Sequence, residues 1–148
     1  MQAKQNRPRE LMREALRQNL EPDEELRWFT YVRHFRAPAL VRALLSWNPW
    51  AVLFLVTYWC VGITPERALF GRMKGRKGPD PSRVIAVPLV DVTVVRRKRG
   101  GDDVFVANHK GGLPGKFRLF TRRDSDELQA LLQTRPPPVP TARGVALP

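Results

Sequence analysis

Two clusters of basic side chains are the residues of this chain best suited to binding chemistry. One cluster follows the stretch RALFG, and the other follows the stretch VTVV. The first consists of Arg72, Lys74, Arg76 and Lys77, and the second consists of Arg96, Arg97, Lys98 and Arg99. Guanidinium groups bind phosphate oxygens in pairs, and ammonium groups attract them as compact charges. The clusters therefore predict contacts with anionic lipid headgroups, and the alternative is solvated charge in two turns.

Three large aromatic side chains form a second candidate contact surface. Trp47, Trp50 and Phe54 lie within the segment 43–65, which contains no charged residue. Tryptophan side chains favour the interface between membrane and water. We therefore expect these residues to contact a membrane or a partner chain, unless the core of the protein buries them.

The sequence contains no pattern that predicts catalysis. It lacks a phosphate-binding glycine loop followed by Lys and Ser or Thr, and it lacks a nucleophile elbow. The stretch GRMKGRKG resembles such a loop in composition alone. His34 and His109 have no second ligand-type residue at a suitable spacing, so we interpret both as structural. We expect a protein that is not an enzyme and that binds no cofactor or metal ion.

Length and charge narrow the choice of partner. The 148 residues correspond to about one domain, and a hydrophobic content of 43% is sufficient for a core. The net charge of +12 favours an anionic membrane, nucleic acid or an acidic protein surface as the partner. Nucleic acid is the weakest of these, because no recognition helix is visible and the aromatic residues lie apart from the basic ones.

The single cysteine and the N-terminal residues indicate a reducing compartment. Cys60 has no partner for an internal disulfide, and its apolar neighbours predict a small buried side chain. The first residues, MQAKQNRPRELMREAL, lack the apolar stretch of a secretory signal. We therefore expect a cytoplasmic protein, attached peripherally to the inner face of the membrane.

A helix, a strand and a hairpin are predicted around the apolar segment. Residues from Pro8 to about Leu20 have helical periodicity, and Pro8 suits a first helical turn. The stretch LRWFTYVRHF, residues 26–35, is rich in aromatic and β-branched residues and predicts a strand. The stretches YWCVGI and RALFGRM predict a hairpin with Thr64-Pro65-Glu66 as its turn.

The second half of the chain predicts further strands and a final helix. Residues 83–97 predict one long strand whose apolar alternation slips at Pro88, which indicates a bend at a barrel corner. Two shorter strands are expected at 104–109 and 116–121. Asp124 is the predicted N-cap of the final helix, with Glu127 completing a capping box.

The uncharged segment allows three interpretations. A single transmembrane span over about 43–63 has sufficient length. Asn48 and Pro49 interrupt that span, its second half suits a strand, and basic residues lie on both sides. The favoured interpretation is a short apolar helix that leads into a buried strand. The third interpretation is an element that lies in the membrane interface.

Short turns between strands favour antiparallel pairing. The predicted fold class is α+β, mainly β, with an antiparallel β-barrel or sandwich, an N-terminal helix and a C-terminal capping helix. We expect a helical arm at 1–24, a domain at 25–134 with an apolar insertion at 37–57, and a Pro-rich disordered tail at 135–148.

Four stretches in this order resemble a bacterial pleckstrin-homology-like (PH-like) domain, over roughly Leu11 to Gln133. The stretch LEPDEELRW resembles the entry into the first strand of that family, and KFRLFT resembles the strand before its final helix. VGITPERALFG resembles its hairpin, and VIAVPLVDVTVV resembles a later strand. The matching positions are Thr64, Arg67, Pro88, Leu89 and Asp91. The resemblance implies a docking module for lipids or proteins without catalytic residues.

These features predict a non-enzymatic PH-like module on an anionic membrane. The basic turns supply electrostatic attraction, the apolar insertion supplies burial, and two weak signals together give stable attachment. The alternative is a protein-interaction or oligomerisation module whose apolar insertion docks a partner chain or a second copy. Consecutive turns of a meander fall on opposite ends of a sheet, so we do not expect the two basic clusters to share a pocket.

Overall fold

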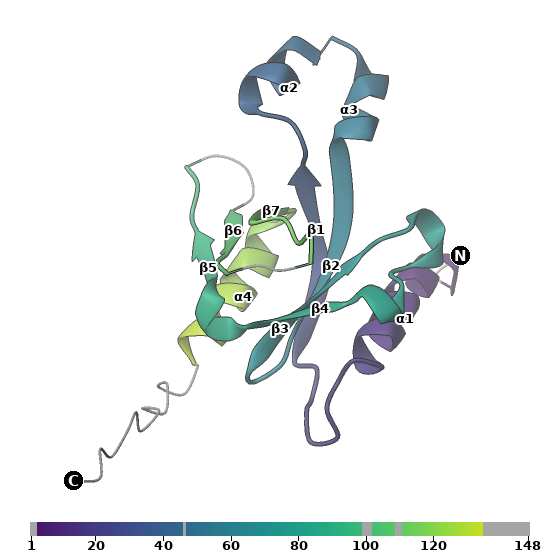
Figure 1. Cartoon of the computed structure of the whole chain (residues 1–148), viewed down its shortest axis with the longest axis vertical. Coiled ribbons are helices and arrows are strands. Elements are labelled where there is room, and N and C mark those ends of the chain that lie inside the picture. Colours follow the sequence, from purple (N-terminus) through teal and green to yellow (C-terminus); the bar gives the residue numbers. More distant parts are fainter. Residues whose placement is uncertain (1–2, 46, 99–101, 109–110, 135–148) are drawn as a thin grey trace, which may run out of the picture.

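The computed structural model describes residues 3–45, 47–98, 102–108 and 111–134. The strands are β1 (Trp28–Phe35), β2 (Val56–Ile63), β3 (Arg67–Arg72), β4 (Ile85–Pro88), β5 (Val92–Val95), β6 (Asp103–Val106) and β7 (Lys116–Leu119). The helices are α1 (Ala3–Arg17), α2 (Ala39–Leu45), α3 (Pro49–Leu55) and α4 (Arg122–Gln133), with short 3-10 turns η1 (Gly75–Lys77), η2 (Pro81–Arg83) and η3 (Leu89–Asp91). Figure 1 shows a curled sheet accompanied by helices, which confirms the predicted mainly β class at this level. The predicted tail at 135–148, Arg99 and His109 lie outside the described residues.

The sheet is an antiparallel half-barrel with the strand order β4-β3-β2-β1-β7-β6-β5. β4 and β5 follow each other in the chain but form the two edges of the sheet, because η3 turns the chain between them. The single long strand predicted over 83–97 is therefore wrong, whereas the predicted bend is present. Val87, Leu89 and Val92 are all buried. A straight strand alternates its side chains and would send Leu89 and Val92 to opposite faces, so burial of both requires the turn.

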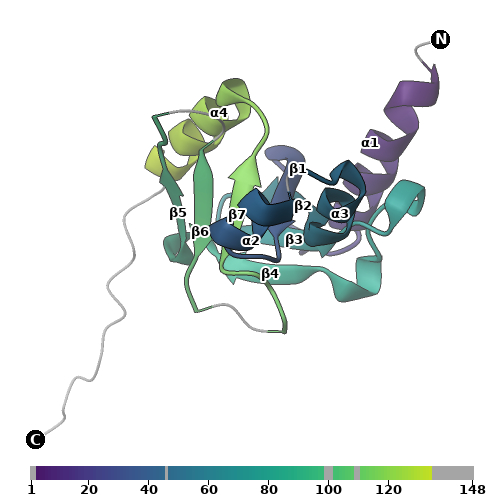
Figure 2. The ribbon, with the colours of Figure 1, turned by 90° about the horizontal axis from the view of Figure 1, so that it is seen from above.

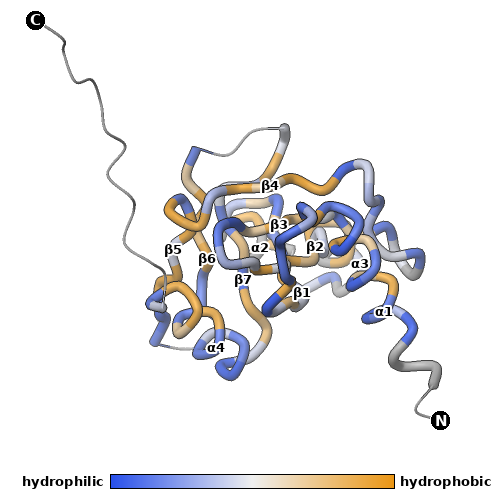
Figure 3. The backbone as a smooth tube through the Cα atoms, turned by 90° about the horizontal axis from the view of Figure 1, so that it is seen from below, coloured by the Kyte–Doolittle hydropathy of each residue, from blue (hydrophilic) through white to orange (hydrophobic). Residues whose placement is uncertain are grey.

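The inner face of the half-barrel carries the main core. Phe70 and Phe117 stack there with ring centroids 5.1 Å apart, and Trp59 meets Phe117 edge-on at 5.7 Å. Leu128 of α4 is buried in the same cluster, so α4 covers this face. Figure 3 shows hydrophobic residues along β3, β4 and β5 and a mixed pattern along α4.

Helix α1 packs on the outer face of the sheet. Met12 and Leu16 are buried in a second cluster with Cys60 and Leu69, so the prediction of a buried cysteine is confirmed. Gly62 permits this close approach, because a Cβ atom at that position would lie only 2.9 Å from a methyl group of Leu16. Figure 2 shows α1 and α4 on opposite flanks of the sheet.

The start of α1 differs from the prediction. The helix begins at Ala3, so Pro8 lies inside it and not in its first turn. Proline at that position removes one backbone hydrogen bond but still adopts helical φ. Burial of Met12 and Leu16 against the sheet compensates for that lost bond.

The cap of α4 is Thr121, so the predicted cap at Asp124 is wrong. Thr121 Oγ1 accepts a hydrogen bond from the Asp124 backbone N–H at 3.1 Å, and the Asp124 carboxylate accepts one from the Thr121 hydroxyl at 2.8 Å. Asp124 therefore takes the position in the capping box that the sequence assigned to Glu127. Glu127 instead accepts a hydrogen bond from the Trp28 indole at 2.9 Å, which links α4 to β1.

The uncharged segment is divided between helix and strand. α3 ends at Leu55, and β2 continues from Val56 into the middle of the sheet, with residues 59–63 buried. This is the short helix leading into a strand that the sequence favours. β2 and β3 are joined at the predicted Thr64-Pro65-Glu66 turn, where Thr64 N–H donates to the Arg67 carbonyl at 3.0 Å. Within the described ranges, no helix combines the length and apolar character needed to cross a membrane.

Candidate functional site

The segment 39–55, which we call the tip, projects from the sheet on the ends of β1 and β2. These strands remain paired as far as Phe35 and Val56, and Figure 1 shows α2 and α3 beyond that point. The large apolar side chains exposed there are Leu40, Val41, Leu44, Trp47, Trp50, Leu53 and Phe54. Exposure reaches 92% for Trp47, 72% for Trp50 and 80% for Phe54. An apolar surface of this kind marks a contact site for a membrane or another chain.

Local sequence explains why the tip presents its aromatic residues. Asn48 caps α3 by accepting a hydrogen bond from the Trp50 N–H at 3.1 Å, and Pro49 occupies the first helical turn. This break separates α2 from α3, two helices of seven residues each, and none of their side chains whose burial is described is fully buried. Trp47 and Trp50 lie on either side of the break and remain exposed.

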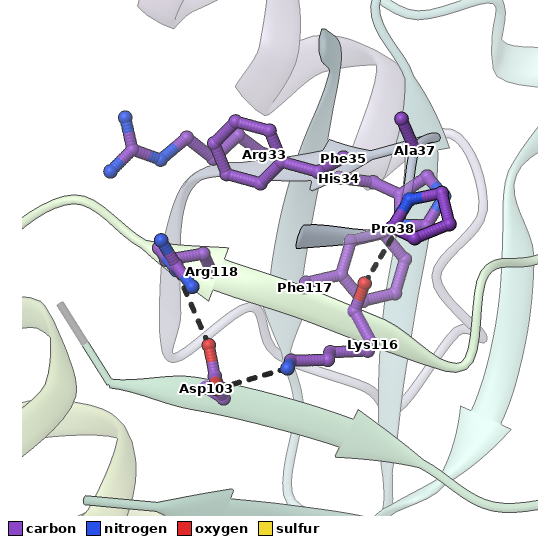
Figure 4. A pocket seen from close by; sticks show the side chains of 9 residues that line it. All are labelled: Arg33, His34, Phe35, Ala37, Pro38, Asp103, Lys116, Phe117 and Arg118. Carbon is purple, nitrogen blue, oxygen red and sulfur yellow. Dashed lines mark hydrogen bonds and ion pairs between the residues drawn. The ribbon is translucent and has the colours of Figure 1, made fainter. Parts of the chain in front are cut away.

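A cavity of about 310 Å³, which we call the notch, lies at the base of the tip. It forms where β1 turns away from β7 into the tip, and it is lined by Arg33, His34, Phe35, Ala37, Pro38, Asp103, Lys116, Phe117 and Arg118. Three cations and one carboxylate line it, which gives a net charge of +2 with His34 neutral. Figure 4 shows these side chains and the interactions among them.

Asp103 is the only carboxylate among the residues that line the notch. It lies 3.4 Å from Arg118 Nε and 3.3 Å from Lys116 Nζ, and it also reaches Arg97 Nε at 3.7 Å. Arg33 lies directly opposite Arg118 across the β1–β7 pair, but in the described part of the chain no carboxylate lies within ion-pair distance of it. The notch thus holds more positive charge than its own acid can balance.

The first predicted basic cluster is exposed and partly paired. Arg72 and Lys77 are exposed, and Lys74 Nζ lies 3.3 Å from Asp80 Oδ2. Hydrogen bonds from Ser82 are the main cause of a lowered Asp80 pKa, and Lys74 adds to the effect. The Arg76 side chain lies outside the described atoms. Among the described side chains of this cluster, Arg72 and Lys77 are exposed cations beside the sheet.

Two arginines of the second predicted cluster, Arg96 and Arg97, form ion pairs with neighbouring acids. Arg96 forms ion pairs with Asp102 and with Asp126. Burial alone would raise the pKa of Asp102, but the Ser125 hydroxyl, the Arg97 backbone N–H and Arg96 together hold that pKa below its ordinary value. Lys98 is exposed. These arginines mainly stabilise the β5–β6 connection and its contact with α4.

The structure does not bring the two basic clusters together. They follow β3 and β5, which have β2, β1, β7 and β6 between them in the sheet. The cations that do converge are Arg33, Lys116 and Arg118, which the sequence analysis missed. The sequence could indicate that these residues lie on the strand face that carries Phe35 and Phe120. It could not indicate that they are neighbours, because this depends on the pairing of β1 with β7.

In the portion that the structure describes, no group of three His, Cys, Asp or Glu side chains is arranged to hold a metal ion.

Comparison with known proteins adds no family assignment: no family model matches the chain, and neither the curated proteins nor the solved structures contain a match.

Proposed function

We propose that this protein is a non-enzymatic PH-like docking module, which attaches peripherally to an anionic membrane, at its cytoplasmic face, by inserting the tip. The observation that carries the proposal is the tip itself, with Trp47, Trp50 and Phe54 largely exposed on a segment without acidic residues. Cations surround its base, including Arg36, Arg33 and Lys116. The apolar tip and the basic residues at its base therefore follow the same order as the acyl chains and the headgroups of a bilayer.

The energies of the two contributions are comparable. Complete burial of one large apolar side chain contributes about 1.5–3 kcal/mol. Each basic residue near an anionic surface contributes about 1 kcal/mol. Several partly inserted side chains and several cations together therefore exceed the marginal attachment that one signal alone supplies.

Co-sedimentation with vesicles tests the proposal. Wild-type protein is expected to pellet with phosphatidylglycerol vesicles and much less with phosphatidylcholine vesicles, and added salt should reduce pelleting. Trp50→Ser should weaken binding about tenfold or more, because a buried indole is lost. Val90→Ser is the matched control, since Val90 is 62% exposed in η3, outside the tip.

Two outcomes would contradict the proposal. Equal pelleting with both lipids would remove the electrostatic part, and no pelleting with either would remove membrane docking altogether. If, in addition, light scattering showed a mass above one chain that Trp50→Ser reduced, the tip would instead be a self-association surface.

A further inference from the structure

We propose that the notch binds the phosphodiester group of an anionic phospholipid, with the guanidinium groups of Arg33 and Arg118 as its donors. This inference rests on the proposed function, because the tip must first bring the notch to the headgroup layer. It identifies the recognised group as phosphate in a lipid, and it assigns recognition to strand residues and not to the two basic turns.

The position of the notch fits a lipid beside the inserted tip. Ala37 and Pro38, which lead from β1 into α2, form part of its wall. A group bound in the notch therefore lies where the apolar tip ends and the cationic surface begins. In a bilayer this boundary is the depth of the phosphate groups.

The placement of Arg33 leaves a donor without an acceptor. Its Nε atom is buried and, within the described ranges, has no hydrogen-bond partner. Arg118 lies directly opposite in the strand pair, and like charges in that relation destabilise a sheet. Burial lowers the pKa of the Arg33 guanidinium, and Arg118 lowers it further. An anion would supply both the missing acceptor and the missing negative charge.

Aromatic contacts hold the two guanidinium groups in place. Arg33 Cζ lies 5.4 Å and Arg118 Cζ lies 5.3 Å from the centroid of the Phe35 ring. Arg33 also lies 5.0 Å from the Phe120 ring, which stacks with Tyr58. These cation–π contacts fix the forks before any ligand arrives, and a fixed pair of forks suits the tetrahedral oxygens of phosphate.

Variants that keep the positive charge distinguish specific phosphate recognition from general electrostatic attraction to an anionic membrane. Arg33→Lys keeps the positive charge but loses the planar fork. Arg72→Lys is the matched control, because Arg72 is an exposed arginine of the same sheet. In the strand register, Arg72 lies opposite Trp59, and Trp59 lies opposite Val32, the residue before Arg33. Both substitutions thus act at the same height on the sheet, one inside the notch and one outside it.

The affinity for phosphatidylglycerol vesicles is the measured quantity. We expect Arg33→Lys to weaken it about tenfold, as charge-assisted hydrogen bonds are lost, and Arg72→Lys to leave it unchanged. Neutral variants should differ as well, with a loss of about thirtyfold for Arg33→Gln and of about fivefold for Arg72→Gln. Circular dichroism verifies folding, and Arg33→Lys alone decides the result if Arg33→Gln does not fold.

Two further experiments distinguish a lipid phosphate from a carboxylate and from free phosphate. In vesicles made anionic with oleate, Arg33→Lys should weaken binding less than in phosphatidylglycerol vesicles, because a carboxylate offers two oxygens to the two forks and a phosphodiester offers four. An equal loss with both lipids would show that the notch binds any oxyanion and would overturn the phosphate assignment. Inorganic phosphate should compete no better than chloride at equal ionic strength, whereas stronger competition would show that the notch binds free phosphate and would overturn the lipid assignment.

The remaining outcomes separate this inference from the proposed function. Equal affinities of Arg33→Lys and Arg72→Lys for phosphatidylglycerol, with Trp50→Ser still defective, would overturn the notch and leave tip insertion standing. Absence of wild-type binding to any vesicle would overturn both.

Discussion

At the scale of single residues, burial decides the chemistry of Cys60. The side chain is fully buried beneath α1, and burial raises the pKa of its thiol to about 12. Because the thiolate is the reactive form, the folded protein should resist thiol reagents at neutral pH. Mass spectrometry after labelling in buffer and in urea checks this, with modification expected only in urea. Labelling of the native protein at the rate of the unfolded chain would contradict the placement of Cys60.

The sequence predicts which side chains are buried better than it predicts which side chains become neighbours. An apolar neighbourhood in sequence was sufficient to predict a buried Cys60, because an interior strand of a small sheet can be covered on both faces. The role of Arg33 could not be predicted in this way. Its environment depends on Arg118, which is distant in sequence and becomes a neighbour only through the register of β1 with β7.

At the scale of elements, one cluster ties the segment before β1 to the β2–β3 turn. Arg67 Nη2 donates to Glu24 Oε2 at 2.6 Å and to the Asn19 carbonyl at 2.9 Å. Thr64 Oγ1 donates to Glu24 Oε1 at 2.5 Å. Glu24 lies in the stretch LEPDEELRW, and Thr64 and Arg67 lie in the stretch VGITPERALFG. Their contact joins the end of the α1 region to the hairpin.

This cluster predicts a specific loss of stability in acid. The hydrogen bond from Arg67 is the main cause that lowers the Glu24 pKa from 4.5 to about 2, against the opposing effect of burial. The folded state therefore holds the Glu24 proton less tightly than the unfolded chain does. The resulting stabilisation is complete above about pH 4.5 and is lost as the pH falls towards 2.

Glu24→Gln tests that dependence. We expect the free energy of unfolding at neutral pH to fall by about 2 kcal/mol and to vary less between pH 4.5 and 2 than in the wild type. Glu25→Gln is the control, because Glu25 is adjacent and exposed. Urea unfolding at several pH values supplies the measurement, and identical profiles for the two variants would refute the role of Glu24.

Elements that a short stretch of sequence determines were predicted correctly. The point at which one strand ends and the next begins was not. The Thr64-Pro65-Glu66 turn is correct because proline restricts the chain locally. The division of 83–97 into β4, η3 and β5 depends on which face each strand must bury in a half-barrel, which a local pattern does not contain. The fold class was thus accessible from sequence, whereas the edges of the sheet were not.

At the scale of the molecule, the fold and the tip are separate parts of the structure. One hydrophobic cluster lies between the sheet and α4, and the other lies between the sheet and α1. Among the residues whose burial the structure describes, neither cluster includes a member of the tip. The tip therefore exposes apolar surface without contributing to the cores, an arrangement that a role in docking accounts for.

This separation predicts that the tip can be removed without unfolding the sheet. Arg36 N–H donates to the Leu55 carbonyl at 2.9 Å, so the two residues that flank the segment 37–54 are already paired. Replacing 37–54 with Asn-Gly, which forms a two-residue hairpin turn, should preserve the circular dichroism spectrum and change the unfolding free energy by less than about 1 kcal/mol. The same variant should lose binding to phosphatidylglycerol vesicles.

The comparison with Val90→Ser makes the deletion decisive, because that variant alters exposed apolar surface outside the tip. A shortened chain that unfolds would show that the tip belongs to the core of the domain. A shortened chain that folds and still binds vesicles with wild-type affinity would place the membrane contact elsewhere on the molecule. Only a folded chain that has lost its binding agrees with a stable half-barrel that carries its contact surface on a projecting ribbon.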